Sequence, residues 1–378
     1  MGKLIPFNVP YVPDASKKYV LEVLEGNHQQ GDGLFTTKTS RMISDLVGGG
    51  HVLLTPSCTH ALEMACMLAN IGPGDEVILP SYTFTSAATA VTKFGAIPVF
   101  VDIKMDTKGI DVEQVRDAIS PKTKAISWVN YAGVAPDIEG LQSLAKEFNL
   151  ILIEDNAHGL GGSYKGKPLG SFGDFATQSF HATKNIQCGE GGALIINNIK
   201  YVDRAEIIRE KGTDRSQYFR GEVDKYQWVD KGSSYLLAEP LAAILLGQVE
   251  NFEEIQRLRK EIWIKFSDLV VESELIHFPS EFKVQLSEVA HIFYIEIENQ
   301  RARSNFVEKA KDIGISVTTH YQPLHNSRAG ARFGISKFEY ENTIKTSTNL
   351  LRFPIYIGLG ENSFEKIDTL IRECQNVF

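Results

Sequence analysis

One lysine and one aspartate stand where a buried amine and a buried carboxylate could act together. Lys184 lies in the segment 178–185, just ahead of the glycine-rich run 189–192. Asp155 ends an apolar, strand-like stretch that begins at Leu150. An amine held in a glycine-flanked turn can form a Schiff base with an aldehyde, and a carboxylate can keep a pyridine nitrogen protonated. The pair therefore predicts an enzyme that uses pyridoxal 5'-phosphate (PLP).

The other groups that PLP requires also have candidates. The run 55–60, Thr-Pro-Ser-Cys-Thr-His, precedes a helical apolar stripe, so its hydroxyls and backbone N–H groups could hold a phosphate. Phe84 follows a strand end and could cover the cofactor ring. Each feature also has an ordinary interpretation: a helix N-cap for 55–60, a turn former for Asp155, a core residue for Phe84 and a solvated charge for Lys184. Their order and spacing together favour a PLP site.

Strand and helix patterns alternate from about residue 50 to residue 200, and they must position these side chains. Apolar stretches that read as buried strands, separated by helical stripes, lie at 77–79, 97–101, 125–131 and 150–153. Successive units of this kind predict an α/β fold with a largely parallel sheet covered on both faces. Ligands in such sheets bind beyond the carboxyl ends of the strands, which is where Asp155 and Asn130 fall.

The pattern changes after about residue 240. Residues 240–260 predict one long helix, and the remainder mixes short strands with helices. We expect a large cofactor-binding domain over residues 1–245 and a smaller C-terminal α+β domain over 246–378. Farther upstream, Asp111 and Gln114 have the spacing of a capping box at the start of a helix over 112–119.

Composition narrows the function classes. The chain has 378 residues, 43% of them hydrophobic, and a formal net charge of −8, which argues against a general binder of nucleic acids or membrane surfaces. The four cysteines lack metal-ligand spacing, so no metal site is expected. Neither a signal peptide nor an apolar run long enough for a membrane span is visible, and we expect a cytoplasmic protein.

Several motifs resemble those of the DegT/StrS nucleotide-sugar aminotransferases. The motifs follow each other in the order seen in that family and span nearly the whole chain. They lie at 55–59, 80–84, 154–158, 179–184, 189–192 and 321–325. Segments that resemble the branch making dTDP-4-amino-4,6-dideoxygalactose lie at 5–8, 209–221, 225–228 and 232–236. The resemblance implies a fold-type I PLP-dependent transferase, in which the large domain has a mostly parallel seven-stranded sheet and the C-terminal domain is smaller.

The resemblance also implies roles for individual residues. Lys184 would be the Schiff-base lysine and the proton-transfer base, and Asp155 would pair with the pyridine nitrogen. The remaining cofactor contacts would come from Ser57, Cys58, Thr59, Phe84, His158, Ser179 and Ser234. The substrate contacts would come from Gly31, Asp32, Gly33, Tyr321 and His325.

The chain departs from the family pattern at a few positions. Ser234 stands where a family asparagine reaches the cofactor phosphate of a partner subunit, and its shorter side chain leaves that role open. Asn130 replaces a common histidine. Dehydratase relatives carry histidine at the position of Lys184, so this lysine argues against that branch.

The charged segment 209–225 allows two interpretations. Its five cationic and four acidic side chains could form a solvated, charge-balanced loop. Alternatively, Arg215 and Arg220 could bind the pyrophosphate of a nucleotide through their guanidinium forks.

The reaction implied by the resemblance is a ping-pong amino transfer in a homodimer. L-Glutamate would donate the amino group, and a dTDP-4-keto-6-deoxyhexose would accept it to give a dTDP-4-amino-4,6-dideoxyhexose of the galacto form. A 3-keto-sugar aminotransferase of the same family is the first alternative. The second is a PLP-binding regulator without turnover, although that class normally carries a DNA-binding appendage and no basic helix pair is visible here.

Overall fold

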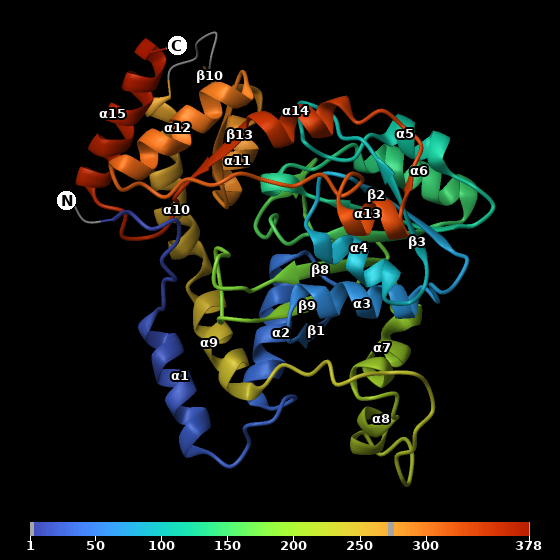
Figure 1. Ribbon diagram of the computed structural model, residues 1–378. Coiled ribbons are helices and arrows are strands. Elements are labelled where there is room, and N and C mark those ends of the chain that lie inside the picture. The colour runs from blue at the N-terminus through green and yellow to red at the C-terminus, as the bar shows by residue number, and fades with distance from the viewer. Residues whose placement is uncertain (1–3, 271–275, 378) are drawn as a thin grey trace.

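An eight-stranded sheet forms the centre of the computed structural model, which describes residues 4–270 and 276–377 (Figure 1). The strand order is β1 (His51–Thr55), β9 (Gly192–Ile196), β8 (Phe175–Ser179), β5 (Ile151–Asp155), β4 (Thr123–Val129), β2 (Glu76–Pro80), β3 (Ile97–Val101) and β12 (Ile335–Ser336). Strand β9 is antiparallel to both of its neighbours, and the other pairs are parallel. The predicted α/β fold with a mostly parallel sheet is confirmed, and the two-residue strand β12 adds an eighth strand to the expected seven.

Helices cover both faces of this sheet. Successive side chains of a strand point to opposite sides of the sheet. Val77 and Leu79 therefore pack into the hydrophobic core on one face, called the first face, and Ile78 between them packs into the core on the other face. The helices of the first face are α3 (Cys58–Leu68), α4 (Thr85–Thr92) and α7 (Val202–Arg209). Those of the other face are α1 (Asp14–Glu25), α2 (Leu34–Leu46), α5 (Val112–Ala118), α6 (Ile138–Phe148) and α9 (Glu239–Glu250).

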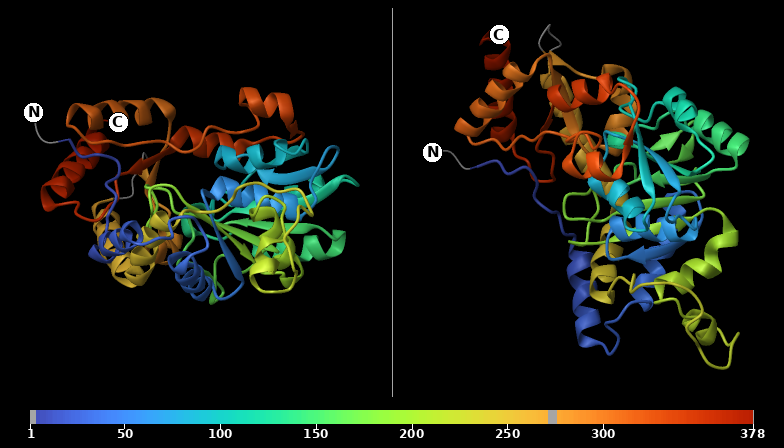
Figure 2. Two further views of the ribbon diagram at one scale, coloured as in Figure 1. Left: turned by 90° about the horizontal axis from the view of Figure 1, so that it is seen from below. Right: turned by 45° about the vertical axis from the view of Figure 1, so that its right-hand side comes forward.

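A second body packs around a three-stranded antiparallel sheet (Figure 2). Its strands are β10 (Ile276–His277), β11 (Phe293–Ile297) and β13 (Leu350–Phe353), and its helices are α10 (Phe252–Leu269), α11 (Lys283–Val289), α12 (Gln300–Asp312) and α15 (Glu361–Val377). This arrangement agrees with the expected C-terminal α+β part. The predicted boundary between residues 245 and 246 falls inside α9 and stays a prediction.

The shorter elements connect or flank these two bodies. They are β6 (Ser163–Tyr164), β7 (Lys167–Pro168), α8 (Arg215–Phe219), α13 (Arg328–Phe333), α14 (Glu341–Asn349) and the 3-10 turns Tyr131–Gly133, Ile199–Tyr201 and Ser280–Phe282. None of the helices in the described parts of the chain is long and apolar enough to cross a membrane.

The single long helix expected over residues 240–260 is wrong. Helix α9 ends at Glu250 and α10 begins at Phe252, while Asn251 between them has φ −103° and ψ 17°. The Asn251 side chain donates a hydrogen bond to the carbonyl of Gly247 at 2.7 Å. An asparagine that bonds nearby backbone groups competes with helix continuation, and the apolar spacing on either side carries no sign of this break.

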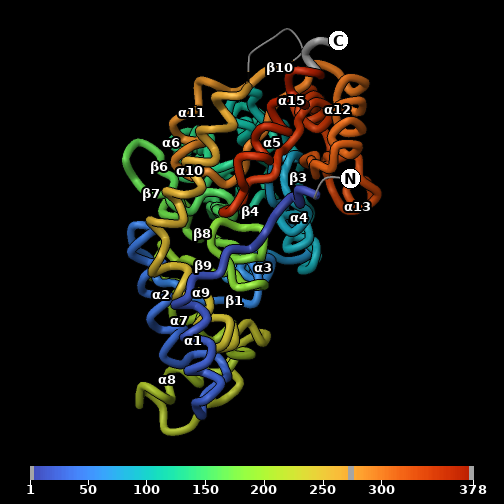
Figure 3. The backbone as a smooth tube through the Cα atoms, turned by 90° about the vertical axis from the view of Figure 1, so that its left-hand side faces the viewer, coloured from blue at the N-terminus to red at the C-terminus, as the bar shows by residue number. Residues whose placement is uncertain are grey.

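The N-terminal segment ties the two bodies together (Figure 3). Ile5 forms a bridge with Ile315, after which the chain runs past the β8–β9 loop and reaches α1. On the way, Asn8 Nδ2 donates to the carbonyl oxygen of Ala182 at 2.9 Å. The segment therefore contacts the loop that carries Lys184.

Candidate active site

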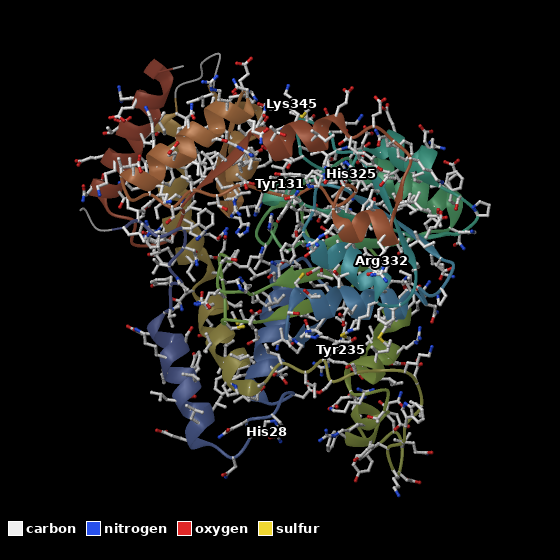
Figure 4. The ribbon with its side chains drawn as sticks, in the orientation of Figure 1. His28, Tyr131, Tyr235, His325, Arg332 and Lys345 are labelled. Atoms are coloured by element: carbon white, nitrogen blue, oxygen red, sulfur yellow. The ribbon has the colours of Figure 1, made fainter. Side chains whose placement is uncertain are left out.

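The carboxyl ends of the central strands open into a cavity of about 600 Å³. Residues that end or directly follow β1, β2, β4, β5 and β8 line it from the large sheet, and the second body closes it from the other side. Figure 4 labels Tyr131 where the two bodies meet. The lining includes most of the predicted cofactor residues: Ser57, Cys58, Thr59, Phe84, Asp155, His158, Ser179 and Lys184.

Lys184 sits in a loop that joins β8 to β9 and is closed by backbone hydrogen bonds. Phe180 N donates to Gly191 O at 2.8 Å, and Ala182 N donates to Gly189 O at 2.9 Å. Burial lowers the pKa of the Lys184 amine to about 8, against the opposing effects of Cys58 and Asp155. A larger fraction of this amine is therefore neutral and nucleophilic near neutral pH than for an ordinary lysine.

Asp155 ends β5 and has few hydrogen-bond partners. Its Oδ1 accepts a bond from Ala157 N at 3.1 Å and lies 3.9 Å from the thiol of Cys58, whereas Oδ2 has no hydrogen bond to any residue in the described ranges. Burial raises the pKa of this carboxyl, while the Ala157 bond and the charge of Lys184 act in the opposite direction. A buried carboxylate in this state favours a cationic partner, and a protonated pyridine nitrogen is such a partner.

The neighbouring carboxylate, Glu154, is in the opposite situation. It accepts bonds from Gly170 N at 2.7 Å, Phe172 N at 2.9 Å and Asn130 Nδ2 at 2.8 Å. Asn130 also donates to Asn156 and thereby continues a buried polar network beneath the cavity. Glu154 and Asn130 thus stabilise the floor of the site, and Asp155 is left to face the ligand.

A phosphate fits at the start of α3. Ser57 caps this helix and accepts a bond from His60 N at 3.2 Å, while Thr59 Oγ1 lies 2.7 Å from Ser86 Oγ. Backbone N–H groups and hydroxyls at a helix start are what a phosphate requires. The Cys58 thiol points toward Asp155 and Thr177 instead, so its contribution to phosphate binding would come from the backbone.

Phe84 and His158 flank the cavity beside Tyr321. The Phe84 side chain is exposed and its ring centroid lies 6.3 Å from that of Tyr321. His158 Nε2 is 3.3 Å from the Tyr321 hydroxyl, and burial with the nearby charge of Lys184 holds the pKa of His158 well below its usual range. A neutral imidazole at this position could receive a hydrogen bond or pack against a ring.

The other predicted residues do not line this cavity. Asp32 pairs with Arg209, Arg215 pairs with Glu210, and Arg220 bonds Glu206 and Glu222. Arg215 begins α8 and Arg220 follows its last residue, while Asp32 and Ser234 contact Arg209 and Glu210 at the end of α7. Figure 1 shows α7 and α8 in the lower part of the molecule.

Gly31, Gly33 and His325 are also held by other parts of the chain. Gly31 packs on the backbone of Leu237, and Gly33 N donates to Glu239 at 3.1 Å. His325 accepts or donates a 2.6 Å bond with Ser81 and stacks on Tyr340 at 3.8 Å. Among the predicted substrate-binding residues, only Tyr321 lines the cavity of the described chain, and the roles of the others stay predictions.

Sequence reasoning missed the residues that the second body contributes. His291, His320 and Arg352 all line the cavity, as does Phe7 from the N-terminal segment. His291 and Arg352 lie in no motif, and they reach the site only when the small sheet folds over the large one. Phe7 lies in the segment 5–8 and His320 directly precedes the segment 321–325, but neither residue was assigned a role. An arginine within the apolar strand 350–353 was the one available signal, since a charged residue in such a strand needs a reason.

Known proteins resemble this chain over most of its length. Residues 11–372 match the DegT/DnrJ/EryC1/StrS aminotransferase family. The uncharacterized protein MJ1066 of Methanocaldococcus jannaschii is 31% identical over 328 residues, which is 85% of each chain. Spr1654 of Streptococcus pneumoniae, described as a sugar aminotransferase and solved in a PLP form, is 26% identical with a TM-score of 0.89 over 100% of both chains.

The fold recurs at lower identity. Helicobacter pylori PseC, an aminotransferase involved in the biosynthesis of pseudoaminic acid, superposes with a TM-score of 0.90 over 100% of both chains at 24% identity. The amine, the carboxylate and the helix start around the cavity suit the three parts of PLP, the cofactor of this enzyme class. The chain is therefore a PLP-dependent aminotransferase and belongs to the DegT/DnrJ/EryC1/StrS family.

Proposed function

We propose that this enzyme transfers the amino group of L-glutamate to C4 of a dTDP-4-keto-6-deoxyhexose and gives the galacto-configured 4-amino-4,6-dideoxyhexose. The observation that carries the amino transfer is the pairing of Lys184 and Asp155 across one cavity of about 600 Å³. The description of Spr1654 as a sugar aminotransferase supports a sugar acceptor. The segments at 209–221, 225–228 and 232–236 support the dTDP-linked 4-keto sugar.

The chain's own residues would carry the proton transfers. PLP, when bound, supplies an electron sink for the electron pair left on the amino-bearing carbon when a proton departs. Lys184 Nζ would take that proton in the first half-reaction and return one to C4 of the sugar in the second. Asp155 would hold the ring nitrogen in its protonated form, because a buried carboxylate with a free Oδ2 is stabilised by a cation.

The sugar nucleotide would extend away from Lys184 toward the mouth of the cavity. Tyr321, between His158 and Phe84, would contact the sugar, and the remote nucleotide would supply binding energy for orientation. Gly31, Asp32, Gly33, Arg215, Arg220, Ser234 and His325 lie outside this protomer's cavity. We infer a homodimer in which the residues around α7 and α8 serve the partner's site, since isologous contacts place the same surface on both subunits.

Product analysis tests this proposal. The enzyme should be incubated with glutamate and, separately, with dTDP-linked 4-keto and 3-keto 6-deoxyhexoses, and the products identified by NMR. We expect amination at C4 with galacto configuration. If only the 3-keto sugar is aminated, the proposed reaction at C4 is wrong, but the enzyme is still a sugar aminotransferase. Absence of amino transfer to any nucleotide-linked keto sugar would contradict the sugar acceptor.

A further inference from the structure

His291 contributes an imidazole with one unused ring nitrogen to the cavity wall. It lies between α11 and β11 in the second body, and it is 5% exposed. Its ring lines the cavity, and Nε2 has no hydrogen bond to any residue in the described ranges. A buried polar atom without a partner needs an explanation, and a group that moves during the reaction can provide one.

Asn185, the residue after the reactive lysine, determines which nitrogen of His291 carries the proton. Asn185 Nδ2 donates to the carbonyl oxygen of Val289 at 2.5 Å and to Gln256 Oε1 at 2.8 Å, so both of its hydrogens are used. Asn185 Oδ1 therefore accepts from His291 Nδ1, which lies 2.9 Å away. Burial, followed by the nearby charge of Lys184, holds the pKa of His291 well below its usual range. His291 is thus neutral, with its proton on Nδ1 and a lone pair on Nε2.

The other histidines that line the cavity in the described parts of the chain are engaged differently. His158 Nδ1 accepts from Ala132 N at 3.4 Å, and its Nε2 lies 3.3 Å from a tyrosine hydroxyl. Both ring nitrogens of His320 also have partners, and His181 is exposed. His291 therefore combines burial with a free acceptor in a way that these three do not.

Lys184 and His291 line the same small recess beside the main cavity. The recess has a volume of about 10 Å³ and is also lined by Asn185, His158 and Gln178. One water molecule needs roughly 10–15 Å³, and an ammonium group is of similar size. Lys184 Nζ has no hydrogen bond to any residue that the structure describes, so it is free to turn toward this recess. The recess therefore fits the lysine nitrogen and excludes a larger ligand.

Proton transfer gives Lys184 a charge that needs an acceptor. When Nζ takes the proton from the amino-bearing carbon, it becomes an ammonium group with three donors, and a buried charge without partners is costly. Arg352 is positive and lowers the pKa of this amine. Asp155 is assigned to the pyridine nitrogen, and burial keeps the Cys58 thiol protonated by raising its pKa. His291 Nε2 supplies a neutral acceptor beside these groups.

We propose that His291 is a positioning residue for Lys184, and that its Nε2 accepts a hydrogen bond from Nζ when this amine carries the transferred proton. The inference rests on the proposed role of Lys184 in proton transfer. The proton stays on Nζ, because the imidazole remains neutral, and it is therefore available for return to C4 of the sugar. A carboxylate at this position would hold the ammonium group more firmly and slow that return.

A crystal structure of the enzyme in its amino form tests the contact itself. Treating holoenzyme crystals with the amino donor moves the amino group to the cofactor and frees Lys184. We expect Lys184 Nζ to lie about 2.7–3.2 Å from His291 Nε2, with His291 Nδ1 still bonded to Asn185. A Lys184 Nζ that bonds other groups and leaves His291 Nε2 without it would overturn the inference.

Two replacements of His291 test its nitrogens separately. In His291→Asn the amide can still donate to Asn185, but no acceptor reaches the position of Nε2, whereas the longer side chain of His291→Gln restores that acceptor. In enzyme without cofactor, the midpoint for acylation of Lys184 should fall by at least about 0.5 pH unit in His291→Asn, because an acceptor stabilises the charged amine. In His291→Gln it should stay within about 0.2 unit of wild type.

The half-reactions provide a second readout. In holoenzyme, His291→Asn should slow both half-reactions about 10-fold and leave the KM of donor and keto sugar within about 3-fold of wild type, because the change acts through Lys184. His291→Gln should recover most of the rate. His277→Asn, at an exposed position of β10, is the matched control and should change neither the midpoint nor the rates. Thermal unfolding establishes that each variant is folded.

The outcomes separate this inference from the proposed function. An unchanged Lys184 midpoint in folded His291→Asn, or equal shifts in His291→Asn and His291→Gln, would overturn the inference and leave amino transfer intact. A rise in the KM of the sugar nucleotide alone would assign His291 to the substrate and also overturn it. If His291→Asn does not fold, the crystal structure of the wild-type enzyme decides. A wild-type holoenzyme that no amino donor converts would contradict the proposed function, while the acylation midpoints would still test His291.

Discussion

Charged side chains have different partners in the floor of the cavity and in the region around α7 and α8, which we call the arm. In the floor, Glu154 is bonded by its own chain, while Lys184 and Asp155 face an open volume. In the arm, Arg215 and Arg220 pair with nearby carboxylates, and Phe219 and Trp228 are 70% and 80% exposed. This difference supports the proposal that one chain completes the chemical half of the site and that the arm serves the nucleotide half in a second copy.

Loss of the Lys184 amine should have the largest effect. We expect Lys184→Ala to lower the rate of both half-reactions at least about 1000-fold, because general acid–base groups contribute roughly 10²–10⁴-fold and this lysine also binds the cofactor. Stopped-flow absorbance with glutamate measures the first half-reaction. Lys165→Ala is the matched control, since Lys165 pairs with Glu139 on the surface. A rate within 10-fold of wild type for Lys184→Ala would remove this residue from the mechanism.

The two adjacent carboxylates of β5 should respond differently to neutral replacement. Asp155→Asn should keep the fold and lower the rate at least about 100-fold, because the ring nitrogen loses its anionic partner. Glu154→Gln should instead destabilise the protein by about 1–3 kcal/mol, because buried N–H donors lose their charged acceptor. Thermal unfolding and half-reaction rates separate the two effects. Equal losses of activity without loss of stability would contradict the division between floor and ligand-facing groups.

Mixing subunits of two different variants tests whether the arm contributes to the active site of the partner subunit. A double variant, Arg215→Ala with Arg220→Ala, should bind the sugar nucleotide at least about 10-fold more weakly, as expected when charge-assisted bonds to a phosphate are lost. When its subunits are exchanged with those of Lys184→Ala, hybrid dimers should regain activity, because one site then combines Lys184 with intact arginines from the neighbour. Hybrid formation is verified by differently tagged chains. Hybrids that form but remain inactive would place the arginines in their own protomer's site or outside any site.

The smallest effect concerns the proton affinity of Lys184. In enzyme without cofactor, acylation of Lys184 should increase with pH around a midpoint near 8, because burial lowers its pKa to about 8 and only the neutral amine reacts. Lys165, whose pKa is raised above 10.5 by its bond to Glu139, should react only at higher pH. Peptide mass spectrometry across a pH series reports both sites in one sample. Coincident profiles would indicate that Lys184 is not desolvated.

The sequence predicts the residues that the large sheet contributes to the site better than those that the second body contributes. Lys184, Asp155 and Ser57 lie at strand or helix ends that apolar spacing and glycine runs mark locally. Arg352 and His320 arrive from the second body, and their approach to Lys184 depends on a packing of two sheets that no local pattern encodes.

Helix boundaries show a similar limit. Asp111 does cap its helix by accepting from Glu113 N at 3.0 Å, but Gln114 accepts from Asp102 N at 2.9 Å and does not close a capping box. A tertiary partner outcompetes the local one there. Asn251 likewise ends α9 through a bond that apolar spacing does not report. Local spacing locates elements, and long-range contacts decide their ends.

Reduction with borohydride tests the central claim most directly, that Lys184 holds the cofactor's aldehyde carbon. Holoenzyme treated with borohydride and digested should yield one pyridoxyl-labelled peptide, with the label on Lys184, and glutamate added beforehand should prevent labelling. A label on any other lysine, or none on a holoenzyme that binds PLP, would contradict the account.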